Sequence, residues 1–153
     1  MKTILVPLDF SSVSRRVLQE ARRLARLLPA RIALIHIVKQ PPILDNYPGA
    51  LIDTTPIIVS LERAARAHLT KWRHQLQKAG FSTTQQIYVG IPGYEIVQEA
   101  KTLRPEYIVI GSHGHNAFYN FAVGSTTGAV IKSAPCPVVV VASPPAATVR
   151  KRR

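Results

Sequence analysis

The chain has 153 residues, of which 46% are hydrophobic and 18% are charged, and its net charge at pH 7 is +12. This length suits one domain with one core, and this composition excludes a disordered chain. No apolar run approaches the ~20 residues that cross a bilayer, and the start lacks a signal peptide's long apolar core, so we expect a cytoplasmic protein. The single cysteine, Cys136, excludes an internal disulfide, and its position between two prolines favours a small buried side chain.

The positive charge is unevenly distributed along the sequence. Four basic residues, 150–153, follow a Pro/Ala-rich stretch, so we assign 1–143 to one domain and 144–153 to a basic, disordered tail. No zinc-finger spacing, helix-turn-helix signature or basic stripe interleaved with aromatics is present, so nucleic acid is not expected as the main partner. A basic adaptor for nucleic acid or acidic partners is retained as a third hypothesis. Five arginines are expected on the solvated face of one helix: Arg15, Arg16, Arg22, Arg23 and Arg26.

Strand and helix patterns alternate in the first half of the chain. The apolar run 4–8 predicts a buried strand, and helical spacing of apolar residues over 14–28 predicts a helix. Residues 31–38 are almost continuously apolar, as strands buried on both faces are. Residues 39–55 contain three prolines and no clear period, so we expect a surface loop that could cover a site. A helix follows, with an apolar stripe running from Leu61 to Leu76.

The second half continues the alternation. We expect strands at 83–89, 107–110 and 137–142, and helices at 96–103 and 126–133. Alternating strands and helices, with strands that read as solid apolar runs, predict an α/β fold. The expected architecture is an open sheet of five parallel strands with helices on both faces.

A glycine-rich segment follows the fourth predicted strand. Gly111-Ser112-His113-Gly114 is separated by nine residues from Gly124-Ser125-Thr126, which opens the last predicted helix. Glycines let a backbone approach a phosphate, and amide groups at a helix start attract anions. Ligands of open parallel sheets bind beyond the carboxyl ends of the strands, where this segment lies. The pattern therefore predicts a phosphate-binding loop.

The spacing Gly-x-x-Gly, nine residues, Gly-Ser resembles the ATP-binding signature of the universal stress protein family. The opening 4–9, the segment 90–92 (Gly-Ile-Pro) and the ending 133–141 also match that family's pattern. The resemblance covers 2–142. It implies an adenine nucleotide α-hydrolase-like fold with strand order 3-2-1-4-5, in which strands one and four are neighbours. Asp9 would then face the glycine loop across the crevice.

The resemblance also implies a ligand, ATP, and a set of binding residues. The glycine loop and the start of the last helix would hold the phosphates and ribose, Asp9 would lie near the ribose or adenine, and Val38 would meet the base through its backbone. Mg²⁺ bridging phosphate oxygens is compatible with this site, but the sequence has no dedicated carboxylate cage for it. The full set is Pro7, Asp9, Val38, Ile110, Gly111, His113, Gly114, Gly124, Ser125, Thr126 and Thr127.

Catalysis has weaker support than binding. His113 and His115 resemble a nucleotidyl-transferase element, but their spacing is one residue too short and they follow the wrong strand. No convincing base for ATP hydrolysis is found, and His36, His68 and His74 are interpreted as structural. The leading hypothesis is a nucleotide-dependent regulatory or stress-response protein, and the alternative is a slow ATP hydrolase or adenylyl-transfer enzyme. Because the last strand should form a sheet edge, we also expect a homodimer through 138–142.

Overall fold

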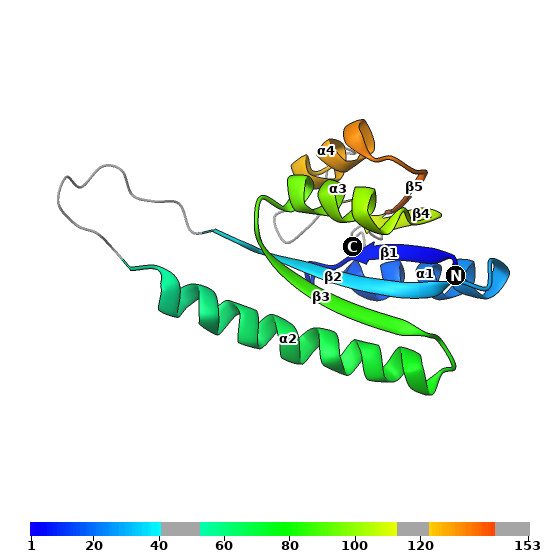
Figure 1. Ribbon diagram of the computed structural model, residues 1–153, viewed down its shortest axis with the longest axis horizontal. Coiled ribbons are helices and arrows are strands. Elements are labelled where there is room, and N and C mark those ends of the chain that lie inside the picture. The colour runs from blue at the N-terminus through cyan, green and yellow to red at the C-terminus, as the bar shows by residue number, and fades with distance from the viewer. Residues whose placement is uncertain (41–52, 113–122, 143–153) are drawn as a thin grey trace, which may run out of the picture.

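The computed structural model describes residues 1–40, 53–112 and 123–142. Within them, five parallel strands form one open sheet in the order β3-β2-β1-β4-β5 (Figure 1), which confirms the predicted sheet and the implied strand order. The strands are β1 (Thr3–Pro7), β2 (Arg31–Lys39), β3 (Thr83–Gly90), β4 (Tyr107–Gly111) and β5 (Val138–Val141).

Four helices in the described part of the chain cover the two faces of the sheet. They are α1 (Ser14–Leu27), α2 (Thr55–Lys78), α3 (Pro92–Leu103) and α4 (Ser125–Ser133). α1 and α2 pack into one apolar core with one face of the sheet, and α3 and α4 pack into a second core on the other. No helix in these residues is long and apolar enough to cross a membrane.

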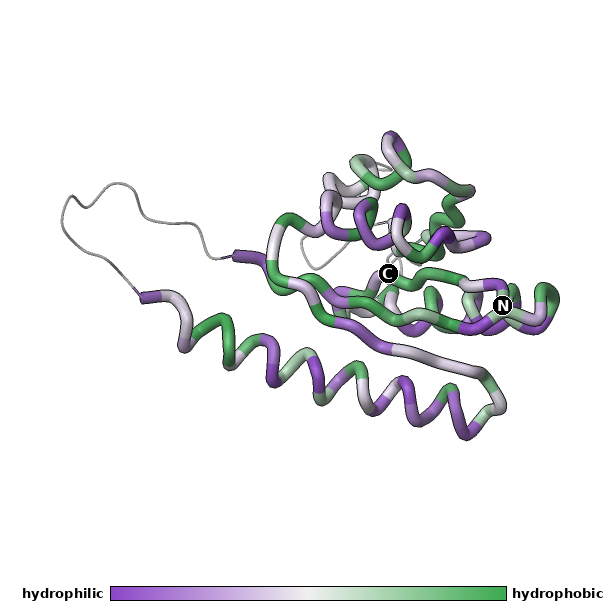
Figure 2. The backbone as a smooth tube through the Cα atoms, viewed as in Figure 1, coloured by the Kyte–Doolittle hydropathy of each residue, from purple (hydrophilic) through white to green (hydrophobic). Residues whose placement is uncertain are grey.

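Successive side chains of β1 point alternately into the two cores. Ile4 and Val6 belong to the core under α1 and α2, whereas Leu5 belongs to the core under α3, and all three are fully buried. Side chains of a strand point alternately to opposite faces, so a strand covered on both sides must be apolar throughout. Figure 2 shows this as hydrophobic colour along the central strands.

α2 begins at Thr55, where the predicted loop 39–55 ends, with a proline in its first turn as helix starts prefer. Its apolar stripe differs from the sequence expectation. The apolar stripe that reaches the core consists of Ala65, Leu69 and Leu76, whereas Leu61 is 46% exposed and lies outside it. The first turns of α2 project beyond the end of β2 (Figure 1), so no sheet residue lies beneath them.

Cys136 is half-buried at the edge of the second core. Burial raises the pKa of its thiol, so the protonated form is favoured. This environment agrees with a structural role for the side chain.

Candidate functional site

The carboxyl ends of β1 and β4 bring four of the predicted site residues together. β1 and β4 are parallel neighbours, with Leu5 opposite Ile108. Pro7 and Ile110, each two residues further along its strand, are buried. Asp9 and Gly111 follow them at the same edge of the sheet, as the implied strand order requires.

Hydrogen bonds fix the beginning of α4 against the end of β4. The backbone NH of Ser112 donates to the carbonyl of Val141 at 2.9 Å, and the NH of Gly124 donates to the carbonyl of Ser112 at 2.9 Å. The hydroxyl of Thr127 donates to the carbonyl of Gly111 at 2.7 Å. The two described ends of the glycine loop are therefore adjacent, while the predicted ligands His113 and Gly114 lie outside the described residues.

The first turn of α4 presents backbone donors at this edge. Gly124 is the N-cap in an extended conformation (φ −60°, ψ 156°), and no side chain caps the helix within the described residues. The intrahelical hydrogen bonds begin with Gly128 NH to Gly124 carbonyl at 2.8 Å. The NH groups of residues 125–127 precede that bond, so they are the amides that a helix start offers to an anion.

The three hydroxyls at the start of α4 have different surroundings. Thr127 is 4% exposed and its hydroxyl proton is used by Gly111, so this side chain joins the helix to the strand. Ser125 is exposed and Thr126 is half-buried. A ligand can therefore take hydroxyl donors from Ser125 and Thr126, and only the backbone NH from Thr127.

Replacing Thr127 with Val tests the anchoring of α4. The variant keeps the shape of the side chain but leaves the Gly111 carbonyl without its donor, so we expect a loss of about 1–3 kcal/mol in the free energy of unfolding. Thr127→Ser keeps the hydroxyl and should lose clearly less. Urea titration of both variants measures the difference, and equal stability of Thr127→Val and wild type would contradict this anchoring role.

Asp9 has a structural role in the turn before α1. Its Oδ1 atom accepts hydrogen bonds from the Ser11 backbone NH at 3.0 Å and from the Ser14 hydroxyl at 3.1 Å. Ser14 is 1% exposed, so the carboxylate organises the first turn of α1. The Asp9 side chain itself is only half-buried, so its contact with a ligand stays a prediction.

The turn after β1 is shaped by residues that the sequence did not identify as important. Phe10 adopts the left-handed conformation, with φ 63°. Its ring stacks on His36 at 4.4 Å between centroids and lies 4.9 Å from His68. Nδ1 of His36 is 2.7 Å from the Leu8 carbonyl. His36 and His68 thus contact the turn that carries Asp9, in line with the structural role expected for them.

Val38 lies where β2 runs past its neighbour. β1 pairs with β2 only as far as Pro7 opposite Ile35, and residues 36–39 continue beyond this pair. On its other side Val38 pairs with Val89 of β3. The backbone near Val38 therefore has a strand neighbour on one side only.

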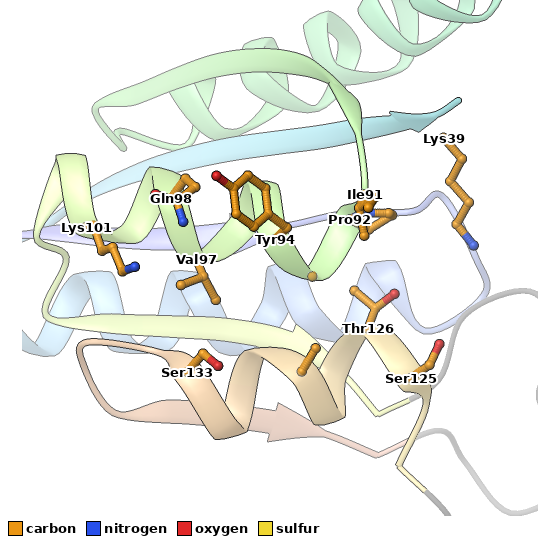
Figure 3. A pocket seen from close by; sticks show the side chains of 12 residues that line it. Lys39, Ile91, Pro92, Tyr94, Val97, Gln98, Lys101, Ser125, Thr126 and Ser133 are labelled. Atoms are coloured by element: carbon orange, nitrogen blue, oxygen red, sulfur yellow. The ribbon is translucent and has the colours of Figure 1, made fainter. Parts of the chain in front are cut away.

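A groove of about 590 Å³ adjoins this edge, between α3 and α4. Ser125 and Thr126 line it at one end, and Figure 3 shows the side chain of Lys39 extending toward the start of α4. Ile91 and Pro92, from the segment 90–92, also line it. Lys39 was not predicted as a site residue, although a cation at the carboxyl end of a buried strand in this fold was a usable signal.

The open parallel sheet with helices on both faces places the chain among the doubly wound α/β proteins, a class whose ligands bind beyond the carboxyl ends of the strands. The universal stress protein family model matches residues 1–142. The chain belongs to the universal stress protein family.

Individual relatives agree with this assignment. Universal stress protein MJ0577 of Methanocaldococcus jannaschii is 28% identical over 152 residues, covering 92% of this chain and 94% of the relative. A solved structure of MJ0577 has a TM-score of 0.81, covering 94% of this chain and 96% of its own. UspA from Lactobacillus plantarum is 30% identical with a TM-score of 0.75, covering 92% and 97%.

Proposed function

We propose that this protein binds ATP at the carboxyl edge of its sheet and acts in the cytoplasm as a nucleotide-dependent regulatory or stress-response protein. The observation that carries the proposal is the position of α4. Its N-terminal amides, which no described side chain caps, are held beside β4 by the Gly124–Ser112 and Thr127–Gly111 hydrogen bonds, on the edge where Asp9 follows β1. A polyphosphate needs this combination of helix amides and close backbone approach.

Other universal stress proteins support an adenine nucleotide as the ligand. The family member of Archaeoglobus fulgidus has been solved in complex with dAMP, and it is 24% identical with a TM-score of 0.64. Another has been solved in complex with cAMP, and it is 20% identical with a TM-score of 0.59. These ligands share adenine, so the base is the part of ATP that the family comparison favours most.

The proposed contacts follow from the geometry of the edge. The amides of residues 125–127 and the hydroxyls of Ser125 and Thr126 would hold the phosphates, with the Lys39 ammonium group as a further partner. Asp9 would accept from the ribose or adenine, and the Val38 backbone would border the base. Among the described residues no group of three His, Cys, Asp or Glu could hold a metal ion. An accompanying Mg²⁺ would therefore be held mainly by the phosphates of ATP.

We favour binding over turnover because the sequence contains no convincing base for ATP hydrolysis. Phosphoryl transfer needs a group that positions the attacking water and stabilises developing charge. His36 stacks on Phe10, and His68 contacts the same ring in a tilted arrangement, on the α1–α2 side of the sheet. Phosphate release at saturating ATP distinguishes the two functions. A regulatory protein should release less than one phosphate per chain over many minutes, whereas repeated turnover on that timescale would establish the slow ATP hydrolase instead.

A homodimer through 138–142 belongs to the same proposal. β5 is the last strand in the sheet order and pairs only with β4 among the described strands. Val140 is 37% exposed on this edge. An unpaired edge of this kind can pair with a second copy.

The Val140→Lys variant tests this dimer. A charged side chain at the edge should prevent strand pairing, so we expect light scattering to give a dimer for wild type and a monomer for the variant. Val89 is equally exposed, at 37%, on β3 at the opposite edge of the sheet, and Val89→Lys should leave the dimer intact. A dimeric Val140→Lys protein, or a monomeric wild type, would show that β5 does not form the interface.

A further inference from the structure

The net positive charge of the described residues is concentrated on one face of the molecule. α1 and α2 each contain five basic residues and one acidic residue, whereas α3 and α4 together contain two basic and two acidic residues. Because α1 and α2 cover the same face of the sheet, their cations lie on the same side of the sheet. This basic face consists of Arg15, Arg16, Arg22, Arg23, Arg26, Arg63, Arg66, Lys71, Arg73 and Lys78.

The cations of the basic face are accessible and largely uncompensated. Eight of the ten are exposed, and Arg22 and Arg73 are half-buried. The one ion pair found among the described residues joins Arg23 to Glu20 at 3.9 Å, a length at which an exposed pair contributes little. A face that concentrates like charge in this way attracts anions and raises their local concentration.

A hollow of about 490 Å³ lies along α1, lined by Gln19, Arg22, Arg23, Arg26 and Leu27. The guanidinium groups of Arg22 and Arg26 lie over the ring of Phe81, at 5.7 Å and 5.2 Å from its centroid. Stacking of this kind orients a guanidinium group and leaves its edge free to donate. The buried Nε atom of Arg22 has no hydrogen-bond partner within the described residues.

The side chains between the cations favour a polyanion over a protein or a membrane. From Arg63 to Lys78 no large apolar side chain is exposed, and on α1 only Leu27 is. Protein interfaces need a buried apolar centre, and membrane-surface helices insert apolar side chains. The exposed Ile57, Val59 and Leu61 lie in the first turns of α2, before the basic stretch. Phosphate backbones need only cations, and most cations here are arginines, which bind phosphates through two donors.

We propose that the basic face binds the sugar–phosphate backbone of double-stranded nucleic acid without regard to sequence. The stretch from Arg63 to Lys78 extends about 22 Å along α2, enough to follow several successive phosphates. No Phe, Tyr or Trp on this face is exposed, so the aromatic platform that single strands need is missing from it. The face lies on α1 and α2 rather than on α4, so the proposal does not depend on ATP binding.

The test measures binding of a fluorescent DNA duplex of about 20 base pairs by anisotropy, over about 50 to 200 mM salt. Arg66 and Lys71 are exposed and make no described contact with the core, so the double variant Arg66→Gln/Lys71→Gln should stay folded. We expect at least a several-fold loss of affinity and a salt slope smaller by about 2. The matched control Lys101→Gln/Lys132→Gln removes two exposed cations from α3 and α4 and should leave both unchanged.

Two further experiments show whether the basic face itself binds the duplex: a truncated chain and a competition with poly-glutamate. A chain lacking 150–153 retains the basic face and should keep the sensitivity to Arg66→Gln/Lys71→Gln. Loss of all binding in that truncated chain, or equal effects of the two double variants, would overturn the proposal. So would competition by poly-glutamate as effective as competition by unlabelled duplex, because the surface would then select acidic protein segments as readily as phosphates.

Discussion

Replacing Gly124 with Val is expected to weaken ATP binding by about 100-fold. Gly124 is the N-cap of α4, where a branched side chain would stand between the phosphates and the amides of residues 125–127. Losing two charge-assisted hydrogen bonds at about 1.5 kcal/mol each corresponds to that factor. The backbone angles of Gly124, φ −60° and ψ 156°, are allowed for Val, so the variant should fold.

A matched control exists one turn further along the helix. Gly128 is exposed, and a Cβ atom added there meets nothing within 4 Å. Gly128→Val therefore introduces the same side chain into α4 without blocking the amides, and calorimetry should give wild-type ATP affinity. A folded Gly124→Val protein that binds ATP as tightly as Gly128→Val would refute the phosphate-binding role of this loop.

Replacing Gly93 with Ala is expected to destabilise the fold by about 1–3 kcal/mol, as overpacking does. A Cβ atom at Gly93 would lie 2.8 Å from Cβ of Ala129, so α3 and α4 must move apart. Movement of α4 would also displace Ser125 and Thr126. We therefore expect a lower urea midpoint together with weaker nucleotide binding.

The double variant Gly93→Ala/Ala129→Gly separates this contact from helix propensity. Ala129→Gly alone should cost about 1 kcal/mol, since Gly is a poor helix former. If the two methyl groups collide, the double variant should be more stable than the sum of the single changes predicts. Strict additivity, or a stable Gly93→Ala protein, would show that α3 and α4 do not meet closely at this position.

The fold could be predicted because its strands are apolar throughout. Runs such as 4–8 and 31–38 leave no polar face, so each strand had to be covered on both sides, and alternation with helices then required parallel neighbours. The strand order could not be predicted from local patterns, because hydrophobic periodicity does not show which strands are adjacent. It was implied by the family resemblance.

The candidate site was predictable at the level of segments and less so for individual atoms. Glycine spacing located the loop, but only the structure shows that the Thr127 hydroxyl is used by Gly111. The left-handed conformation of Phe10 was also not predicted. A bulky residue seldom adopts positive φ, and no neighbouring residue in the sequence indicates it here. Leu61 was placed in the core because its helical spacing is correct, and spacing cannot reveal where the sheet beneath a helix ends.

The charge of α2 was overlooked for a similar reason. Sequence reasoning attributed the basic character mainly to α1 and the tail, because five cations spread over a 24-residue helix look like an ordinary solvated face. α2 contains as many basic residues as α1. Because both helices pack on one side of the sheet, their cations lie together on the basic face.

The most direct test of the central claim is calorimetric titration of ATP into nucleotide-free wild-type protein, with GTP as the comparison. We expect saturable binding of about one ATP per chain, since the proposal assigns one nucleotide site to each chain, and much weaker binding of GTP. Absence of saturable ATP binding by the folded protein would contradict the proposed function.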